Sequence, residues 1–110
     1  MNEINWNDFE KVDLRTGTIL EAEIFREARK PAYKLIIDFG ELGIMKSSAQ
    51  LTKLYLPADL VGQQIIAVTN FPKKQIGPLM SECLVLGVQD NDKVTLLTTE
   101  SKTKNGAKIS

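Results

Sequence analysis

Lysine, serine and asparagine side chains that could bind a polyanion gather in two stretches of the second half of the chain. The first stretch is "GIMKSSAQ" at residues 43–50, and the second is "NFPKKQIGPLMSEC" at residues 70–83. Ammonium, hydroxyl and amide groups in combination hold phosphate and sugar and contact base edges. The same residue types occur in any solvated loop, so the residues taken alone favour a solvated loop. The candidate polar set is Lys46, Ser47, Ser48, Asn70, Lys73, Lys74 and Ser81.

The residues needed for common catalytic sites are absent. The chain has no histidine, no phosphate-binding GxxxxGK[ST] motif and no dinucleotide-binding GxGxxG motif. Cys83 precedes the apolar run "LVLGV", and a thiol buried in such surroundings is unreactive. Glu21 and Glu23 alternate along a polar strand face, which fits a solvated surface better than a catalytic pair. We therefore predict no enzyme activity, no metal and no cofactor.

Length and charge limit the class of protein. The 110 residues match the usual size of one domain, so we predict a single domain over residues 1–110. The net charge is zero, but residues 1–41 hold nine acids and six bases, whereas residues 42–110 hold five acids and eight bases. Any basic face must therefore be local. No apolar run approaches the roughly 18 residues that span a bilayer, and no signal-peptide pattern is present. We expect a cytoplasmic protein without membrane insertion.

The N-terminal stretch "NEINWNDFEKVD" predicts a short helix. Asn5 is a suitable N-cap, Asp8 lies in the first turn, and Trp6 and Phe9 are three residues apart on one side. Two turns are not stable alone, so these aromatic rings must pack on the domain or on a partner subunit. We assign Trp6 and Phe9 to a possible dimer interface.

Alternating apolar and polar residues predict about six strands. Residues 12–25 form a long candidate strand, in which Gly17 indicates a bulge or sharp bend and Leu20 and Ile24 lie on the buried side. Further strands are predicted within residues 33–40, 43–50, 63–71, 82–89 and 93–100. The spacing of Leu51, Leu54 and Tyr55 predicts a short helix that Pro57 ends. Residues 101–110 form a polar tail that is either flexible or an edge addition.

This density of strands favours a small barrel over a parallel α/β sheet, which needs a helix after nearly every strand. We predict an all-β fold, namely a five-stranded OB-fold barrel with a short N-terminal helix, a short helix between strands 3 and 4, and C-terminal additions. OB barrels bind ligands on the face of strands 2 and 3, where Lys34 joins the polar set. Phe39, Tyr55 and Phe71 are candidates for a peptide pocket, although most aromatic rings in small domains are core residues.

Several ordered motifs resemble the tRNA-binding domain family. They are "FEKVDLRTGTILEAE", "ARKPAYKLIIDFG", "SSAQLTKLY", "LVGQQIIAVTNFP" and "SECLVLG". The resemblance runs from about residue 6 to about residue 97. Within the family, "KPAYKL.IDFG", "SSAQLT..Y" and "NFP" are most similar to the CsaA type, an export-related chaperone. The family's Ser-Glu-Gly-Met run carries over as Ser81 and Glu82, whereas Cys83 and Leu84 depart from it. Where the CsaA type has a prolyl pair after Phe, this chain has Pro72 and Lys73, which adds a charge.

The resemblance implies a homodimeric OB barrel that binds structured RNA in the wider family and unfolded or export-bound polypeptide in the CsaA type. The first hypothesis is a CsaA-like, secretion-related chaperone for such polypeptides. The alternative is a free-standing protein that binds tRNA or another structured RNA and has no chaperone role. Ser81 and Glu82 belong to the predicted RNA-binding set, with Lys73 and Lys74 as its basic rim. On the chaperone hypothesis the rim faces acidic side chains of a client polypeptide in place of RNA phosphate.

Overall fold

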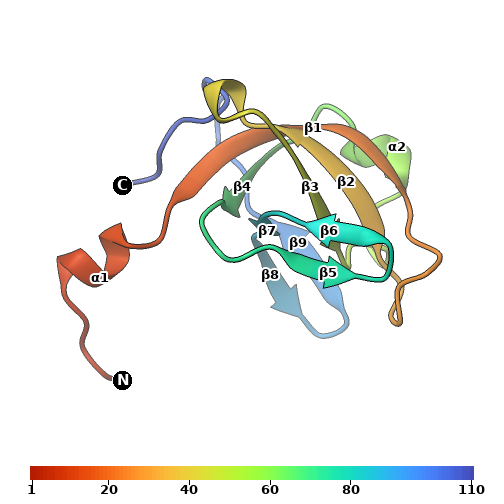
Figure 1. Cartoon of the computed structure of the whole chain (residues 1–110), viewed down its shortest axis with the longest axis horizontal. Coiled ribbons are helices and arrows are strands. Elements are labelled where there is room, and N and C mark those ends of the chain that lie inside the picture. The colour runs from red at the N-terminus through yellow and green to blue at the C-terminus, as the bar shows by residue number, and fades with distance from the viewer.

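The computed structural model describes all 110 residues, and strands dominate it (Figure 1). In chain order the elements are α1 (Trp6–Glu10), β1 (Leu14–Ile24), β2 (Tyr33–Asp38), the 3₁₀ turn η1 (Gly40–Leu42), β3 (Ile44–Ala49), α2 (Pro57–Leu60), β4 (Gln64–Val68), β5 (Lys74–Ile76), β6 (Leu79–Ser81), β7 (Leu84–Val85), β8 (Gly87–Asp90) and β9 (Lys93–Leu96). Neither helix is long and apolar enough to cross a membrane.

Five strands form one curved antiparallel sheet in the order β3-β2-β1-β4-β7, and two hairpins, β5–β6 and β8–β9, are attached to it. The curvature brings the edge strands β3 and β7 close together, so the barrel is nearly closed. The helix α2 lies between the third and fourth barrel strands. The predicted OB-fold, with its two short helices, is confirmed.

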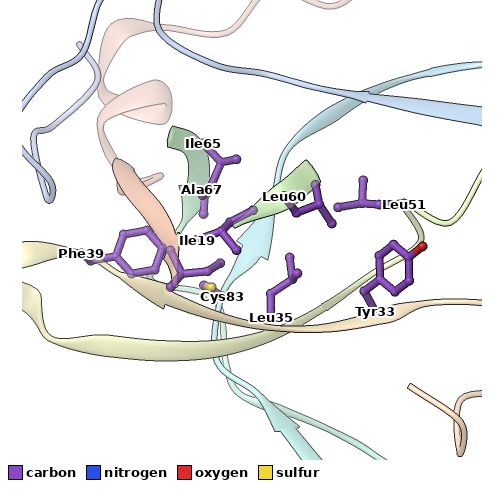
Figure 2. Packing of buried hydrophobic residues seen from close by; sticks show 10 residues of the cluster. Ile19, Tyr33, Leu35, Phe39, Leu51, Leu60, Ile65, Ala67 and Cys83 are labelled. Carbon is purple, nitrogen blue, oxygen red and sulfur yellow. The ribbon is translucent and has the colours of Figure 1, made fainter. Parts of the chain in front are cut away.

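The interior of the barrel holds a single main core of ten buried residues (Figure 2). Strand β2 illustrates how the sequence builds it, because Tyr33, Leu35 and Ile37 point inward while the residues between them are partly exposed. The core comprises Ile19, Tyr33, Leu35, Ile37, Phe39, Leu51, Leu60, Ile65, Ala67 and Cys83.

Strand β1 differs from the sequence prediction in one respect. Its register shifts between Ile19 and Glu21, so the irregularity lies beyond Gly17. Gly17 is instead a site of close packing, since a Cβ atom there would lie 2.7 Å from the Phe39 ring. The predicted burial of Leu20 and Ile24 is wrong, because both are exposed, whereas Ile19 is fully buried. A shift of one position moves side chains to the opposite face.

Two connections also correct the prediction. Pro57 begins the helix α2 at its first position instead of ending an earlier helix, which fits a residue with no backbone N–H to donate. Residues 74–81, predicted as a loop, form the β5–β6 hairpin, in which Gly77 has a φ of 53° at the turn. This hairpin extends the chain over the barrel surface before β7 begins.

The C-terminal tail is an edge addition to the barrel. The N–H of Gly106 donates to the carbonyl of Thr16, and the N–H of Ile109 donates to the carbonyl of Leu14. Buried Gln64 accepts from the N–H of Thr103 and donates to the carbonyl of the same residue, at 2.9 and 2.8 Å. The tail thus covers the start of β1.

Helix α1 stands apart from the barrel (Figure 1). Its N-terminus is capped as predicted, because the side chain of Asn5 accepts from the N–H of Asp8 and the carboxylate of Asp8 accepts from the N–H of Asn5. The rings of Trp6 and Phe9 lie 5.4 Å apart, and Trp6 is 61% exposed. Within one chain, Trp6 therefore has little to pack against.

Candidate nucleic-acid interface

Two segments far apart in the sequence form the walls of the largest surface groove. They are the β1–β2 loop, residues 25–32, and the β5–β6 hairpin, and they lie side by side in Figure 1. A second small core holds them together, with Phe25 and Ala32 contributed by the loop side and Leu79 by the hairpin. Ala28 and Ile76 pack against this cluster. This second core therefore holds the two walls of the groove together.

The groove has a volume of about 520 Å³ and a mainly polar lining. Three of its side chains, Arg29, Lys30 and Lys74, are exposed cations that form no ion pair. The acid in the lining, Glu27, pairs with Lys34. The remaining lining residues are Ala28, Ala32, Ser48, Gln50, Gln75, Ile76 and Gly77. The groove thus presents an excess of positive charge beside amide and hydroxyl groups.

Lys34 lies beside this groove but is held by acids. Its Nζ is 3.8 Å from a carboxylate oxygen of Glu27 and 4.0 Å from one of Glu23. It also lies 5.1 Å from the centre of the Phe25 ring, a cation–π distance. The lysine charge is therefore largely balanced within the protein, through Glu23 and Glu27.

Of the residues on β3 predicted to contact RNA, two are accessible. Lys46 is exposed on the outer face, and Ser48 is half-buried at the floor of the groove. Ser47 points inward and is fully buried, and its Oγ donates to the carbonyl of Cys83 at 2.9 Å. This placement corrects the expectation for Ser47, because alternate residues of a strand face opposite sides of the sheet.

Cys83 is a member of the main core, and its carbonyl accepts the hydrogen bond from Ser47. The pKa of its thiol is raised to about 11. Burial is the largest cause, a hydrogen bond with Ser47 acts in the opposite direction, and the charge of Glu82 adds to the rise. A thiol that stays protonated at neutral pH is a poor nucleophile. Cys83 therefore serves as a core residue.

Asn70 is a structural residue at the end of β4. Its side chain donates to the carbonyl of Lys11 at 2.7 Å and accepts from the N–H of Asp13 at 2.9 Å. Asn70 is exposed, and both ends of its amide already pair with the backbone, so its contact with RNA stays a prediction. It joins the barrel to the segment that follows α1.

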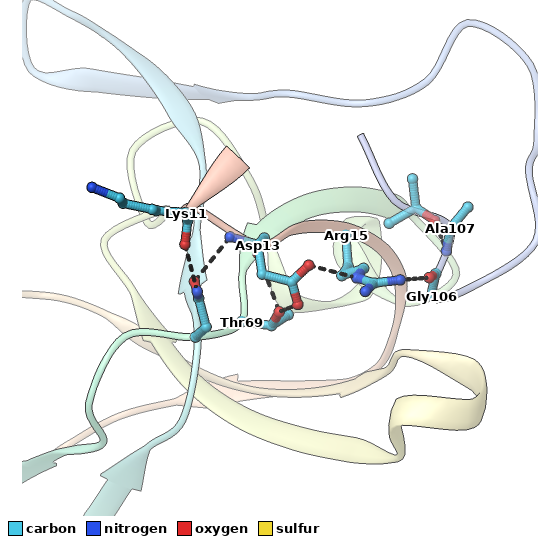
Figure 3. A network of polar contacts seen from close by, with 8 residues as sticks. Lys11, Asp13, Arg15, Thr69, Gly106 and Ala107 are labelled. Atoms are coloured by element: carbon cyan, nitrogen blue, oxygen red, sulfur yellow. Dashed lines mark hydrogen bonds and ion pairs between the residues drawn. The ribbon is translucent and has the colours of Figure 1, made fainter. Parts of the chain in front are cut away.

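A polar network continues from this point along β1 (Figure 3). Asp13 accepts from Thr69 Oγ1 at 2.7 Å and from Arg15 Nε at 2.9 Å, and Arg15 donates to the carbonyl of Gly106. Burial raises the pKa of Asp13, but the hydrogen bonds from Thr69 and Arg15, with the charges of Arg15 and Lys108, outweigh it and lower that pKa. Arg15 is thus engaged in fixing the C-terminal tail.

Residues of the second stretch lie around a smaller cavity of about 140 Å³ next to the groove. Lys74 lines both the groove and the smaller cavity, whereas Ser81 and Glu82 line the smaller cavity. Lys73 lies 3.5 Å from a carboxylate oxygen of Glu82 and forms an ion pair with it. The two consecutive lysines therefore differ, since Lys73, just before the hairpin, is paired and Lys74, at its start, forms no ion pair.

The three predicted peptide-pocket aromatics have different environments. Phe71 is 50% exposed and lines the smaller cavity with Pro72 and Leu84. Tyr55 is half-buried against the main core, and its hydroxyl accepts from the N–H of Leu96 at 3.0 Å. Phe39 is fully buried in the core, which corrects its assignment to a binding pocket. Of the three aromatics, Phe71 is thus the most exposed.

Sequence reasoning missed the β1–β2 loop as part of the site. Arg29 and Lys30 lie in "ARKPAYKLIIDFG", which resembles a family motif, but neither residue was assigned to the predicted binding set. A usable signal was present, because the loop between strands 1 and 2 of an OB barrel borders its ligand face. Gln50 and Gln75 were missed as well, since no local pattern marks them.

Fold and groove together define a class, an OB-type binding domain whose ligand face is bordered by the β1–β2 loop and the segment between β4 and β7. The chain belongs to the tRNA binding domain family, whose model matches residues 14–108. This family is a binding domain and not a catalytic one.

Solved structures and curated relatives agree with this membership. The chaperone CsaA from Bacillus anthracis strain Ames is 54% identical with a TM-score of 0.93, covering 99% of this chain and 100% of that one. CsaA from Picrophilus torridus is 50% identical with a TM-score of 0.93, covering 98% and 100%. The methionine–tRNA ligase of Thermotoga maritima is 37% identical over 109 residues, which are 99% of this chain. The chain spans 17% of the length of that ligase.

Proposed function

We propose that the protein binds structured RNA of the tRNA type through the groove between the β1–β2 loop and the β5–β6 hairpin. The observation that carries this proposal is the set of three unpaired cations on the two walls, Arg29, Lys30 and Lys74. Phosphates are bound by these side chains, while Ser48, Gln50 and Gln75 donate to sugar or base atoms. No catalytic step is part of the proposal, and such a role fits a cytoplasmic protein.

The charge balance supports a local binding face. The net charge is zero, and two of the predicted RNA-binding lysines, Lys34 and Lys73, are paired with acids of the same chain. RNA affinity therefore depends on the few cations that remain free at the groove. The affinity falls with salt, because each neutralised phosphate releases counterions.

A charge-matched pair of variants tests the proposal. The groove variant is R29A/K30A/K74A, and the control is K53A/K93A/K102A, whose lysines are exposed, lie outside the groove and form no ion pair. Titration with tRNA at several salt concentrations measures affinity and salt slope. We expect the groove variant to lose about two units of slope, at about 0.7–0.9 per phosphate, and the control to lose much less. Equal losses in the two variants would refute the placement.

Polypeptide binding is a second candidate function, and the apolar cavity beside the groove favours it. Phe71 and Leu84 are both about half exposed at this cavity, and the similar CsaA structures are of proteins described as chaperones. An unfolded or export-bound segment would place an apolar side chain between these two residues. Such binding resists moderate salt, because burial of apolar surface drives it.

An aggregation assay tests this second candidate. The protein is added at near-stoichiometric ratio to an unfolding client, and F71S is compared with V88S, which changes an equally exposed apolar residue on β8 outside this cavity. The candidate function predicts that F71S loses the suppression of aggregation while V88S keeps it. If the unaltered protein does not suppress aggregation, the polypeptide role is rejected and the RNA role is unaffected.

Homodimer formation is the third element of the proposal. Helix α1 projects from the barrel, and exposed Trp6 and half-buried Phe9 form its apolar side. Packing of this side on a second copy of the chain would remove an exposed aromatic surface from water. A dimer would also present two grooves to one RNA.

A further inference from the structure

We infer that Glu82 is a positioning residue for the groove and also competes with RNA for Lys73, the lysine just before the β5–β6 hairpin. The inference rests on the proposed RNA-binding function and gives Glu82 a role other than direct contact with the ligand. Each oxygen of the Glu82 carboxylate has a different partner. Oε1 accepts from the N–H of Lys46 at 2.9 Å, and Oε2 lies 3.5 Å from Nζ of Lys73.

The first partner closes the barrel. Strands β3 and β7 are the two edges of the sheet, and the residues just before β7 bridge them. The N–H of Glu82 donates to the carbonyl of Lys46 at 2.8 Å, so the two residues exchange a pair of hydrogen bonds. Ser47 Oγ adds a third bond to the carbonyl of Cys83. Without the carboxylate, the N–H of Lys46 loses its partner within the protein.

This closure sets the position of the hairpin. The β5–β6 hairpin ends at Ser81, one residue before Glu82, and β6 lies against β3. The hairpin carries Lys74, one of the three free cations of the groove. Fixing Glu82 on Lys46 therefore fixes the distance between Lys74 and the cations of the β1–β2 loop.

The second partner, Lys73, affects how much positive charge the protein presents to RNA. The Glu82 side chain is 22% exposed and that of Lys73 is 65% exposed, so the acid is anchored in the wall and the lysine is the mobile member. The Glu82 carboxylate competes with RNA phosphate for Lys73, and the lysine loses its ion-pair partner once the negative charge is removed. Glu82 therefore lowers the number of cations that the hairpin offers to phosphate.

Two substitutions at Glu82 separate these roles, because both remove the charge and one keeps a hydrogen-bond acceptor. In E82Q the amide oxygen still accepts from the N–H of Lys46, and Lys73 is released. In E82A both functions are lost. We expect E82A to bind tRNA about three- to tenfold more weakly than E82Q, the range that loss of one hydrogen bond implies. Amide hydrogen exchange at Lys46 should accelerate in E82A and stay unchanged in E82Q.

The released lysine is detected by its salt dependence. Relative to the unaltered protein, E82Q should steepen the salt slope of tRNA binding by about 0.7–0.9, equivalent to one further phosphate. This increment should vanish in K73A/E82Q when that variant is compared with K73A. An increment that persists would mean a general charge effect and would overturn the role assigned to Lys73. Equal tRNA affinity of E82A and E82Q would overturn the positioning role.

Hydrogen exchange at the Lys46 amide tests the inference about Glu82 independently of RNA binding. If the unaltered protein shows no salt-dependent affinity for tRNA, the RNA-binding proposal fails. Exchange at the Lys46 amide still tests the closure without RNA, and equal rates in E82A and E82Q would overturn it. Thermal unfolding of both variants checks that each remains folded.

Discussion

Phe25, at the start of the β1–β2 loop, and Leu79, in the β5–β6 hairpin, are buried in one small cluster. They are separated by almost half the chain in sequence, yet together they hold the two walls of the groove. Ala32 is the third buried member of the cluster. With so few members, the cluster cannot fill the space that a truncated side chain would leave. The shape of the groove therefore depends on a very small hydrophobic core.

The first prediction concerns this cluster. L79A should lower the free energy of unfolding by about 2 kcal/mol, the low end for a buried leucine, because the site lies near the surface. Its tRNA affinity should fall severalfold with an unchanged salt slope, since the cations remain but are displaced. Urea denaturation and RNA titration measure the two effects. The control M80A alters the exposed neighbour and should change stability by less than about 0.5 kcal/mol. Unchanged affinity in a folded L79A would contradict the supporting role.

The second prediction concerns the proposed dimer. W6A should raise the dissociation constant about thirtyfold, because a buried interface tryptophan typically contributes about 2 kcal/mol or more. Sedimentation over a range of protein concentrations measures this constant. L56A serves as the control, since Leu56 is also exposed but precedes α2 on the barrel. A dimer that is equally stable in W6A would exclude α1 from the interface, and a monomeric unaltered protein would reject the dimer.

The third prediction concerns Cys83 at alkaline pH. Its pKa in the folded state is raised to about 11 from the ordinary value of 9.0, so the folded protein holds the thiol proton more tightly than the unfolded chain. The resulting contribution to stability is complete below pH 9 and is lost as the pH rises toward 11. C83A should remove this alkaline component of the unfolding curve. Alkylation at pH 8 should be slow in the native protein and rapid in urea, and fast native alkylation would show an accessible thiol.

The fourth prediction concerns Asp13 at acidic pH. Its pKa is lowered in the folded state, so the ionised carboxylate stabilises the protein at pH values above the ordinary pKa of 3.8. That contribution is lost as the pH falls through the lowered pKa. The stability difference between the unaltered protein and D13N should therefore shrink below pH 3.8. Denaturation at several pH values measures the difference, and D90N, at an exposed hairpin position, is the control. A difference independent of pH would contradict the assignment.

Local sequence was sufficient for most of the fold. Alternation in Tyr33–Asp38 predicted a half-buried strand, and Asn5 with Asp8 predicted a capped helix, because both features depend on residues within a few positions of one another. Pro57 was misassigned for a related reason, since proline is compatible with both the end of one helix and the first turn of the next.

The site depended on contacts that no local pattern contains. The residue types of Lys34, Lys73 and Lys74 are the same, yet acids pair with two of them and leave the third free. Glu23 lies opposite Lys34 on the neighbouring strand β1, Glu27 lies in the β1–β2 loop, and Glu82 lies between β6 and β7. The pairing therefore depends on how these elements fold together. Sequence by itself determined which residues alternate, cap and turn, because those preferences act over short range. Tertiary structure decided which charges are cancelled and which walls meet, because Coulomb interactions and burial depend on distance in space.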